Sequence, residues 1–114
     1  MNTNELTQKI CKAASKIKAE NIVIMNMQGI MFSTDCFVIC NAATATQVRA
    51  IADNIEEELL KDGIKFNHRE GYHEAEWILL DYGDVVTHIF KTESRDYYAL
   101  EKLWGDAEIK RYEE

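Results

Sequence analysis

Two aspartates lie close together in the stretch EWILLDYGDVVTHIF (76–90), where two apolar runs flank a short turn. Paired carboxylates at the end of two strands can hold Mg²⁺ for phosphoryl transfer, and they can equally face a basic partner. The sequence contains no Gly-Ser loop before a D-x-D pair, no GxxxxGK[ST] and no GxGxxG, which often accompany phosphate chemistry. We therefore interpret Asp81 and Asp84 as a charged contact surface, and a Mg²⁺-dependent nucleotidyl-transferring enzyme is the less favoured alternative.

Two other groups of side chains are candidates for chemistry. His68, Glu70 and His73 lie close together, but their spacing matches no zinc-binding motif and no cysteine joins them. Cys36 and Cys40 lie four residues apart in an apolar segment, where burial raises the pKa of a thiol and makes it inert. Because there is no GxSxG segment either, the sequence predicts no catalytic residue, no metal site and no cofactor.

The first stretch also predicts a hairpin whose two strands are joined by Tyr82 and Gly83. This turn pairs Asp81 with Asp84, and side chains alternate between the two faces of each strand. One face carries a mixture of aromatic, acidic and histidine side chains that is typical of protein contacts, and the other is aliphatic and suits a core. The mixed face comprises Trp77, Leu79, Asp81, Asp84, Val86, His88 and Phe90, and the aliphatic face comprises Ile78, Leu80, Val85, Thr87 and Ile89. Trp77 could instead pack under the last helix, and we expect a one-residue shift of the turn to exchange the faces.

The rest of the sequence predicts the elements that hold this hairpin. Apolar residues recur at helical spacing in two segments before it. Thr44 and Gln47 have capping-box spacing at the start of the second segment, Gly63 ends it, and Ser94 is predicted to cap a last helix. The predicted order is a helix at 4–18, strands at 21–27 and 35–42, a helix from 44 to the stop at 63, strands at 65–70, 76–81 and 84–90, and a helix from 94. This αββαβββα order predicts an α/β fold with a mixed sheet of about five strands and helices packed on it.

The composition is that of a globular chain, and we expect one domain over residues 1–114. Hydrophobic residues make up 46% and charged residues 29%, and the formal net charge is −7. This charge argues against nucleic acid as the principal contact, because phosphate binding needs clustered Lys and Arg, and it suits a basic protein partner. No segment has the apolar core of a signal peptide or approaches the length of a membrane span. We therefore expect a cytoplasmic protein that contacts no membrane.

Several segments together resemble the ribosomal silencing factor family, also called the Iojap or DUF143 family. They are TDCFVI (34–39), QVRAIAD (47–53), REG (69–71), WILLDYGDVVTHIF (77–90) and RDYYALEKLWGDA (95–107). The resemblance covers nearly the whole chain, and the combination of W-x-L-L-D-Y-G-D with R-x-x-Y-x-L-E-x-L-W is specific.

The resemblance implies a fold related to nucleotidyltransferases without their catalytic loop, and a translational repressor that is not an enzyme. Such a repressor binds the large ribosomal subunit through the basic ribosomal protein uL14, with little direct contact to ribosomal RNA. It blocks joining of the small subunit, so translation falls when nutrients are scarce. The resemblance also implies a homodimer off the ribosome, and a large-subunit assembly factor without a silencing role is the alternative.

The resemblance also assigns residues to the partner surface, which we name the candidate face. It comprises Glu70, Trp77, Leu79, Asp81, Asp84 and His88, with Tyr98, Glu101 and Trp104 as contributors from the last helix. For these three, packing is an equally good account. The chain departs from the family pattern at Cys36, Thr46 and Thr87, where members commonly have an aromatic residue, an arginine and a valine. These departures bear on local packing more than on function.

Overall fold

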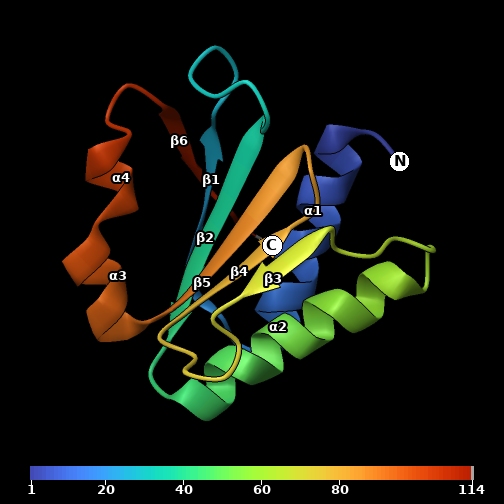
Figure 1. Cartoon of the computed structure of the whole chain (residues 1–114), viewed down its shortest axis with the longest axis vertical. Coiled ribbons are helices and arrows are strands. Elements are labelled where there is room, and N and C mark those ends of the chain that lie inside the picture. Colours follow the sequence, from blue (N-terminus) through green and yellow to red (C-terminus); the bar gives the residue numbers. More distant parts are fainter. Residues whose placement is uncertain (114) are drawn as a thin grey trace.

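Six strands form one mixed sheet in the computed structural model, which describes residues 1–113 (Figure 1). The strand order is β3-β4-β5-β2-β1-β6. The central pair β2 and β5 is parallel, and the other neighbouring pairs are antiparallel. The elements are α1 (Thr3–Lys16), β1 (Glu20–Asn26), β2 (Cys36–Ala42), α2 (Ala45–Leu60), β3 (His68–Glu70), β4 (Trp77–Asp81), β5 (Val85–Lys91), α3 (Thr92–Tyr98), α4 (Leu100–Leu103) and β6 (Glu108–Arg111). The predicted α/β class with a mixed sheet is confirmed, but the sheet has six strands where the sequence predicted about five.

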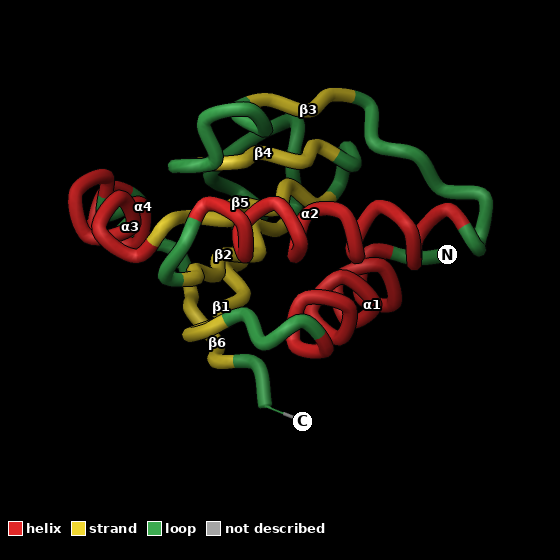
Figure 2. The backbone as a smooth tube through the Cα atoms, turned by 90° about the horizontal axis from the view of Figure 1, so that it is seen from below, coloured by secondary structure: helices red, strands yellow, loops and turns green. Residues whose placement is uncertain are grey.

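Helices α1 and α2 lie side by side on one face of the sheet, and α3 and α4 lie on the other (Figure 2). The start of α2 is partly as predicted, because Thr44 Oγ1 accepts a hydrogen bond from the Gln47 backbone N–H at 3.1 Å. The reciprocal half of the capping box is wrong, since the Gln47 amide donates to the Ile17 carbonyl instead. That bond, with a second from Asn54 Nδ2 to the Ala13 carbonyl at 2.8 Å, ties the two helices together.

A large apolar core fills the space between the sheet and the α1–α2 layer. It takes the apolar stripes of both helices and the aliphatic face of the hairpin, including Ile78, Leu80 and Ile89. All three cysteines are buried here: Cys11, Cys36 and Cys40. Burial raises the pKa of each thiol, that of Cys40 to about 12, which is the inert state expected for apolar surroundings.

The segment after β5 differs from the single last helix that was predicted. It forms two short helices separated by Ala99, whose φ of 46° lies in the left-handed region. The predicted Ser94 cap is also wrong, since Lys91 is the N-cap of α3 and Ser94 lies inside the helix. A second, smaller core lies beneath these helices and includes Phe90 and Leu100.

Strand β6 has no counterpart in the prediction. It pairs antiparallel with β1, with Ile109 opposite Met25 and Arg111 opposite Val23. All of its residues are exposed, as are those of β3 at the opposite edge. Charged side chains on both edge strands discourage pairing with other chains.

The hairpin turn lies one residue further along the chain than predicted. The backbone N–H of Tyr82 donates to the Val85 carbonyl at 2.9 Å, so Gly83 and Asp84 form the loop. Asp81 is therefore opposite Val86 rather than Asp84. The expected exchange of faces does not occur, because moving a loop of constant length by one residue slides the pairing by two positions. The predicted face of every paired strand residue is retained, and only Asp84 leaves the mixed face for the turn.

Candidate functional site

Three strands place the first part of the candidate face in one row across the sheet. Glu70 of β3 is opposite Leu79 of β4, and Leu79 is opposite His88 of β5. Burial increases along this row, since Glu70 is exposed, Leu79 is half-buried and His88 is only 4% exposed. The Glu70 carboxylate at the sheet edge is thus available to a partner, whereas His88 lies beneath the surface and supports the residues above it.

His88 fixes the orientation of Trp77. Its Nδ1 accepts a hydrogen bond from Trp77 Nε1 at 3.0 Å, and burial lowers the pKa of His88 to about 4, so the ring is neutral at neutral pH. A neutral ring that accepts at Nδ1 carries its proton on Nε2. That nitrogen is buried without a hydrogen-bond partner in the described part of the chain. The imidazole lies edge-on to the Phe37 ring, with centroids 4.5 Å apart.

Aromatic rings continue the candidate face from the sheet onto α3. The Trp77 ring lies 5.0 Å from that of Phe90 and 4.8 Å from that of Tyr98, measured between centroids. Trp77 is half-buried and Tyr98 is 46% exposed. Both interpretations of Trp77 therefore describe part of its environment, because it packs against α3 and still reaches the surface.

The two aspartates have different environments. Asp81 is half-buried, and its Oδ1 accepts the Gly83 backbone N–H at 2.7 Å, which closes the turn. Asp84 is exposed, and its Oδ2 accepts a hydrogen bond from Thr3 Oγ1 of α1 at 3.5 Å. Asp81 thus shapes the turn, and Asp84 presents a carboxylate to solvent.

The two remaining predicted residues, one on α4 and one directly after it, have internal contacts. Glu101 Oε2 accepts a hydrogen bond from Arg95 Nη2 at 3.0 Å. Trp104 is half-buried against the smaller core. The structure places both on the α3–α4 side of the sheet, where each has a packing or pairing role of its own.

Three strongly exposed apolar side chains lie outside the predicted candidate face. Phe32 is fully exposed in the β1–β2 loop, and Tyr97 and Leu103 are largely exposed on α3 and α4. The loop borders the hairpin turn, because Thr34 Oγ1 donates to the Gly83 carbonyl at 3.2 Å. A signal for Phe32 existed: an apolar run directly after Gly29, in a segment with neither helical nor strand periodicity.

The residues considered for metal chemistry do not gather into one site. His68 Nε2 and Glu70 Oε2 are 3.1 Å apart on an exposed strand, whereas the His73 backbone lies beside Arg49 of α2. Across residues 1–113, no three His, Cys, Asp or Glu side chains are grouped so that they could hold a metal ion. Over the same residues, no helix has both the length and the apolar character needed to cross a membrane.

The fold and the candidate face define a small α/β protein whose aromatic and acidic surface groups suit contact with another macromolecule. Comparison with known proteins identifies the family. The chain belongs to the ribosomal silencing factor family, since the model for "Ribosomal silencing factor during starvation" matches residues 1–114.

Curated relatives and solved structures agree with this assignment. The chain is 45% identical to the ribosomal silencing factor RsfS of Halalkalibacterium halodurans, over 94% of this chain and 92% of the relative. It is 41% identical to RsfS of Bacillus subtilis, over 96% and 92% of the two chains. It is also 35% identical to the chloroplastic protein Iojap of Zea mays, over 86% of this chain and 42% of that protein. A crystal structure of a Chromobacterium violaceum protein superimposes with a TM-score of 0.89 at 30% identity, covering 92% of this chain and 88% of the other. A Bacillus halodurans crystal structure gives a TM-score of 0.84 at 40% identity, covering 98% and 100%.

Proposed function

We propose that this chain represses translation by binding the large ribosomal subunit through uL14 and sterically blocking the small subunit when nutrients are limited. Membership of the ribosomal silencing factor family supports the ribosomal role. The observation that carries the choice of surface is the combination, on the candidate face, of the packed Trp77 and Tyr98 rings with two exposed carboxylates. Glu70 lies at the sheet edge, and Asp84 lies in the hairpin turn. The repressor acts in the cytoplasm, without catalysis, and forms a homodimer off the ribosome.

The candidate face has the arrangement of a protein interface. Half-buried Trp77 and Leu79, with Tyr98 beside them, are apolar groups that suit anchors at the centre of a contact. Asp84 lies at the hairpin turn and Glu70 at the sheet edge, where carboxylates at the rim of a contact meet a basic partner and speed its association. Phe32 next to the turn adds an exposed apolar side chain to the same end of the sheet.

Charge reversal at the rim tests this surface. The double variant Glu70→Lys with Asp84→Lys leaves the Asp81 turn bond in place, so it changes charge without removing that support. We expect its affinity for isolated large subunits at low salt to fall about tenfold, which is about 1.4 kcal/mol. The matched control is Glu57→Lys with Glu74→Lys, which makes the same charge change at two exposed acids outside the candidate face.

The comparison of the two double variants decides the site. Weaker binding confined to the Glu70 and Asp84 variant supports contact through the candidate face. If the two variants bind large subunits with equal affinity, the candidate face is not the contact surface. If the wild-type chain associates only with precursor particles and not with mature large subunits, an assembly role replaces silencing.

A further inference from the structure

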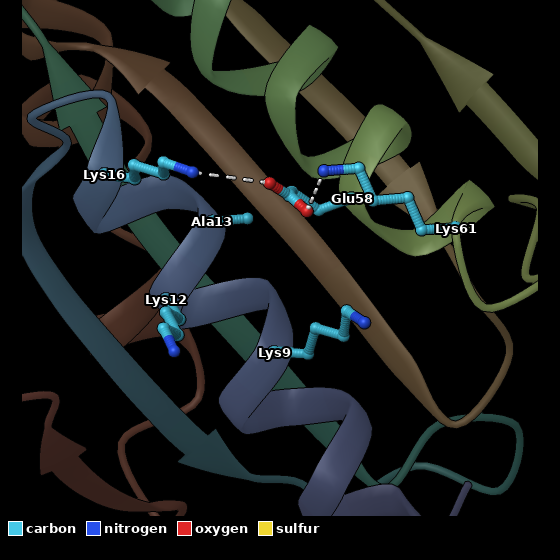
Figure 3. A pocket seen from close by; sticks show the side chains of 6 residues that line it. All are labelled: Lys9, Lys12, Ala13, Lys16, Glu58 and Lys61. Carbon is cyan, nitrogen blue, oxygen red and sulfur yellow. Dashed lines mark ion pairs between the residues drawn. The ribbon is translucent and has the colours of Figure 1, made fainter.

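A groove lies between α1 and α2. These two helices lie on the side of the sheet opposite to α3 and α4 (Figure 2). Its volume is about 390 Å³, and it is lined by Lys9, Lys12, Ala13, Lys16, Glu58 and Lys61 (Figure 3). We name these residues, without Ala13, the lysine groove. None of the four lysines belongs to the candidate face, and the proposed contact with uL14 does not use them.

The lysine groove has an excess of positive charge in an acidic chain. Lys16 reaches Glu58 from α1 at an Nζ to carboxylate distance of 3.6 Å, and Lys61, the C-cap of the helix that carries Glu58, reaches it at 3.0 Å. Lys9 pairs with Asp62. Lys12 is exposed, extends away from Glu58, and has no ion pair with the residues that the structure describes. Four lysines against two carboxylates leave a local formal charge of +2, whereas the whole chain carries −7.

The existing ion pairs leave the lysines available to a ligand. The side chains of Lys16 and Lys61 are 69% and 63% exposed. Exposed pairs of this kind contribute about 0–1 kcal/mol, so a stronger anion can replace Glu58 with little loss of stability. Lysine presents a compact charge without the planar fork with which arginine matches a carboxylate, and it binds phosphate well as a point charge.

The spacing of the lysines suits a row of phosphates. Lys9, Lys12 and Lys16 lie at i, i+3 and i+7 along α1, so they share one side of the helix. From Lys9 to Lys16 the helix rises roughly 10 Å. One strand of a nucleic-acid duplex carries a phosphate for every roughly 3 Å of its axis, so a helix aligned with the duplex axis places this row along about three phosphate steps.

We propose that the lysine groove binds the phosphate backbone of ribosomal RNA on the same large subunit that the candidate face engages. This inference rests on the proposed function and adds a second contact to it. It also revises the expectation of little direct contact with ribosomal RNA, which came from the family resemblance. Exposed charges further apart than about 8 Å are largely screened at physiological salt. The carboxylates on the opposite side of the sheet therefore do not cancel the positive charge of the lysine groove.

Removal of two groove lysines tests the contact. The variant Lys12→Gln with Lys16→Gln takes away the unpaired lysine and the most exposed paired one. The matched control is Lys65→Gln with Lys110→Gln, two exposed lysines outside both surfaces. Binding to a fluorescein-labelled RNA duplex, to purified uL14 and to large subunits is measured by anisotropy or sedimentation at several salt concentrations.

We expect the groove variant to bind uL14 like the wild type and the control. It should bind the RNA duplex and the large subunit several-fold more weakly at low salt. The slope of log affinity against log salt should be shallower by about two for both, because each lost lysine–phosphate contact removes about one.

Equal duplex affinity and equal salt slopes for the groove variant and the control would overturn the inference. It is also overturned if the groove variant loses affinity for the subunit while no form of the chain binds the duplex, since the anion would then belong to a protein. Failure of the wild type to bind uL14 would count against the proposed function instead, and the duplex result would still decide whether the groove binds RNA.

Discussion

Trp77 and His88 are joined by a hydrogen bond that exists in only one protonation state of the imidazole. Nδ1 of His88 accepts the Trp77 Nε1 proton, so a proton on Nδ1 would remove the acceptor and place a charge in an apolar site. Burial accordingly lowers the pKa of His88 to about 4. Although it is itself buried, His88 is a positioning residue for the central aromatic group of the candidate face.

The protonation of His88 should make stability depend on pH. An unfolded histidine has a pKa of about 6.5, so the unfolded chain binds this proton first as the pH falls. The contribution of neutral His88 is therefore fully present above about pH 6.5 and is lost as the pH falls through about 4, by about 3 kcal/mol in total. We expect this loss in the free energy of unfolding measured with urea over that range.

The variant His88→Gln isolates this contribution. Glutamine offers an acceptor for Trp77 and does not titrate, and all carboxylates are shared with the wild type. The difference in unfolding free energy between the two proteins should therefore shrink by about 3 kcal/mol on acidification. A difference that stays constant with pH would show that His88 is not held neutral by burial.

At this scale the sequence identified the residue types of the candidate face but not their separate roles. Asp81 and Asp84 look equivalent in the printed sequence, and the position of the turn makes one a backbone acceptor and the other a surface charge. Tyr-Gly is not a strong turn signal, so local sequence could not decide the loop. The burial of His88 depends on Phe37 of a strand that lies about fifty residues earlier, which no local pattern reveals.

Gly71 joins β3 to β4 and has a conformation that only glycine adopts without strain. Its φ is 77°, and a Cβ placed at this position would lie 2.0 Å from the Trp77 carbonyl oxygen. The close approach keeps the β3–β4 connection tight beside Trp77. Gly63 at the end of α2 has a similar φ of 73°, but a Cβ at that position would meet only open space.

The variants Gly71→Ala and Gly63→Ala separate strain from collision. Gly63→Ala should lower the unfolding free energy by about 1 kcal/mol, which is the strain of a left-handed alanine. Gly71→Ala should lower it by at least about 3 kcal/mol, because the backbone must also move away from Trp77. Chemical denaturation measures both, and equal losses would contradict the close approach of the two segments.

Arg95 attaches α3 and α4 to the sheet. Its side chain is 11% exposed, and its guanidinium donates to Glu101, to Asn41 Oδ1 at 2.8 Å and to the Asn21 carbonyl at 2.6 Å. This one side chain therefore reaches α4, β2 and the start of β1. The positions of Tyr98 and Trp104 depend on it, because both lie on the segment that it holds.

The variant Arg95→Met should lower the unfolding free energy by about 2–4 kcal/mol, since it leaves the partly buried Glu101 and the buried Asn41 without their donor. Lys102→Met is the control, an exposed cation on α4. Thermal or urea unfolding distinguishes the two. If the Arg95 variant lost no more stability than the control, apolar packing alone would hold α3 and α4 on the sheet.

At the scale of elements, most helices and strands followed from periodicity, caps and turns, and the misses have physical causes. Alanine is a strong helix former, so nothing local predicted the break at Ala99, which lies between the helices that Arg95 and Glu101 bridge. Strand β6 is short and exposed, and its partner β1 lies over eighty residues earlier, so its pairing has no local signature. The prediction of a mixed sheet is still correct, because the central strands were predicted correctly.

The whole molecule has two surfaces of opposite charge on opposite faces of one thin sheet. The candidate face presents carboxylates beside aromatic rings, and the lysine groove presents ammonium groups. With principal extents of 35 × 34 × 27 Å, the chain is small enough for one ribosomal subunit to contact both surfaces. Two contacts on one subunit would hold the chain more tightly than either alone, because the second contact forms at high effective concentration.

The most direct test of the proposed function is a subunit-joining measurement in sucrose gradients. The purified chain is mixed with large subunits, small subunits are then added, and the Glu70→Lys with Asp84→Lys variant is run in parallel. We predict that the wild-type chain co-sediments with large subunits and that whole ribosomes fail to form, whereas the variant permits more joining. Whole ribosomes that form at the normal level while the wild-type chain remains bound would contradict steric blocking, and a chain that stays at the top of the gradient at low salt would contradict binding itself.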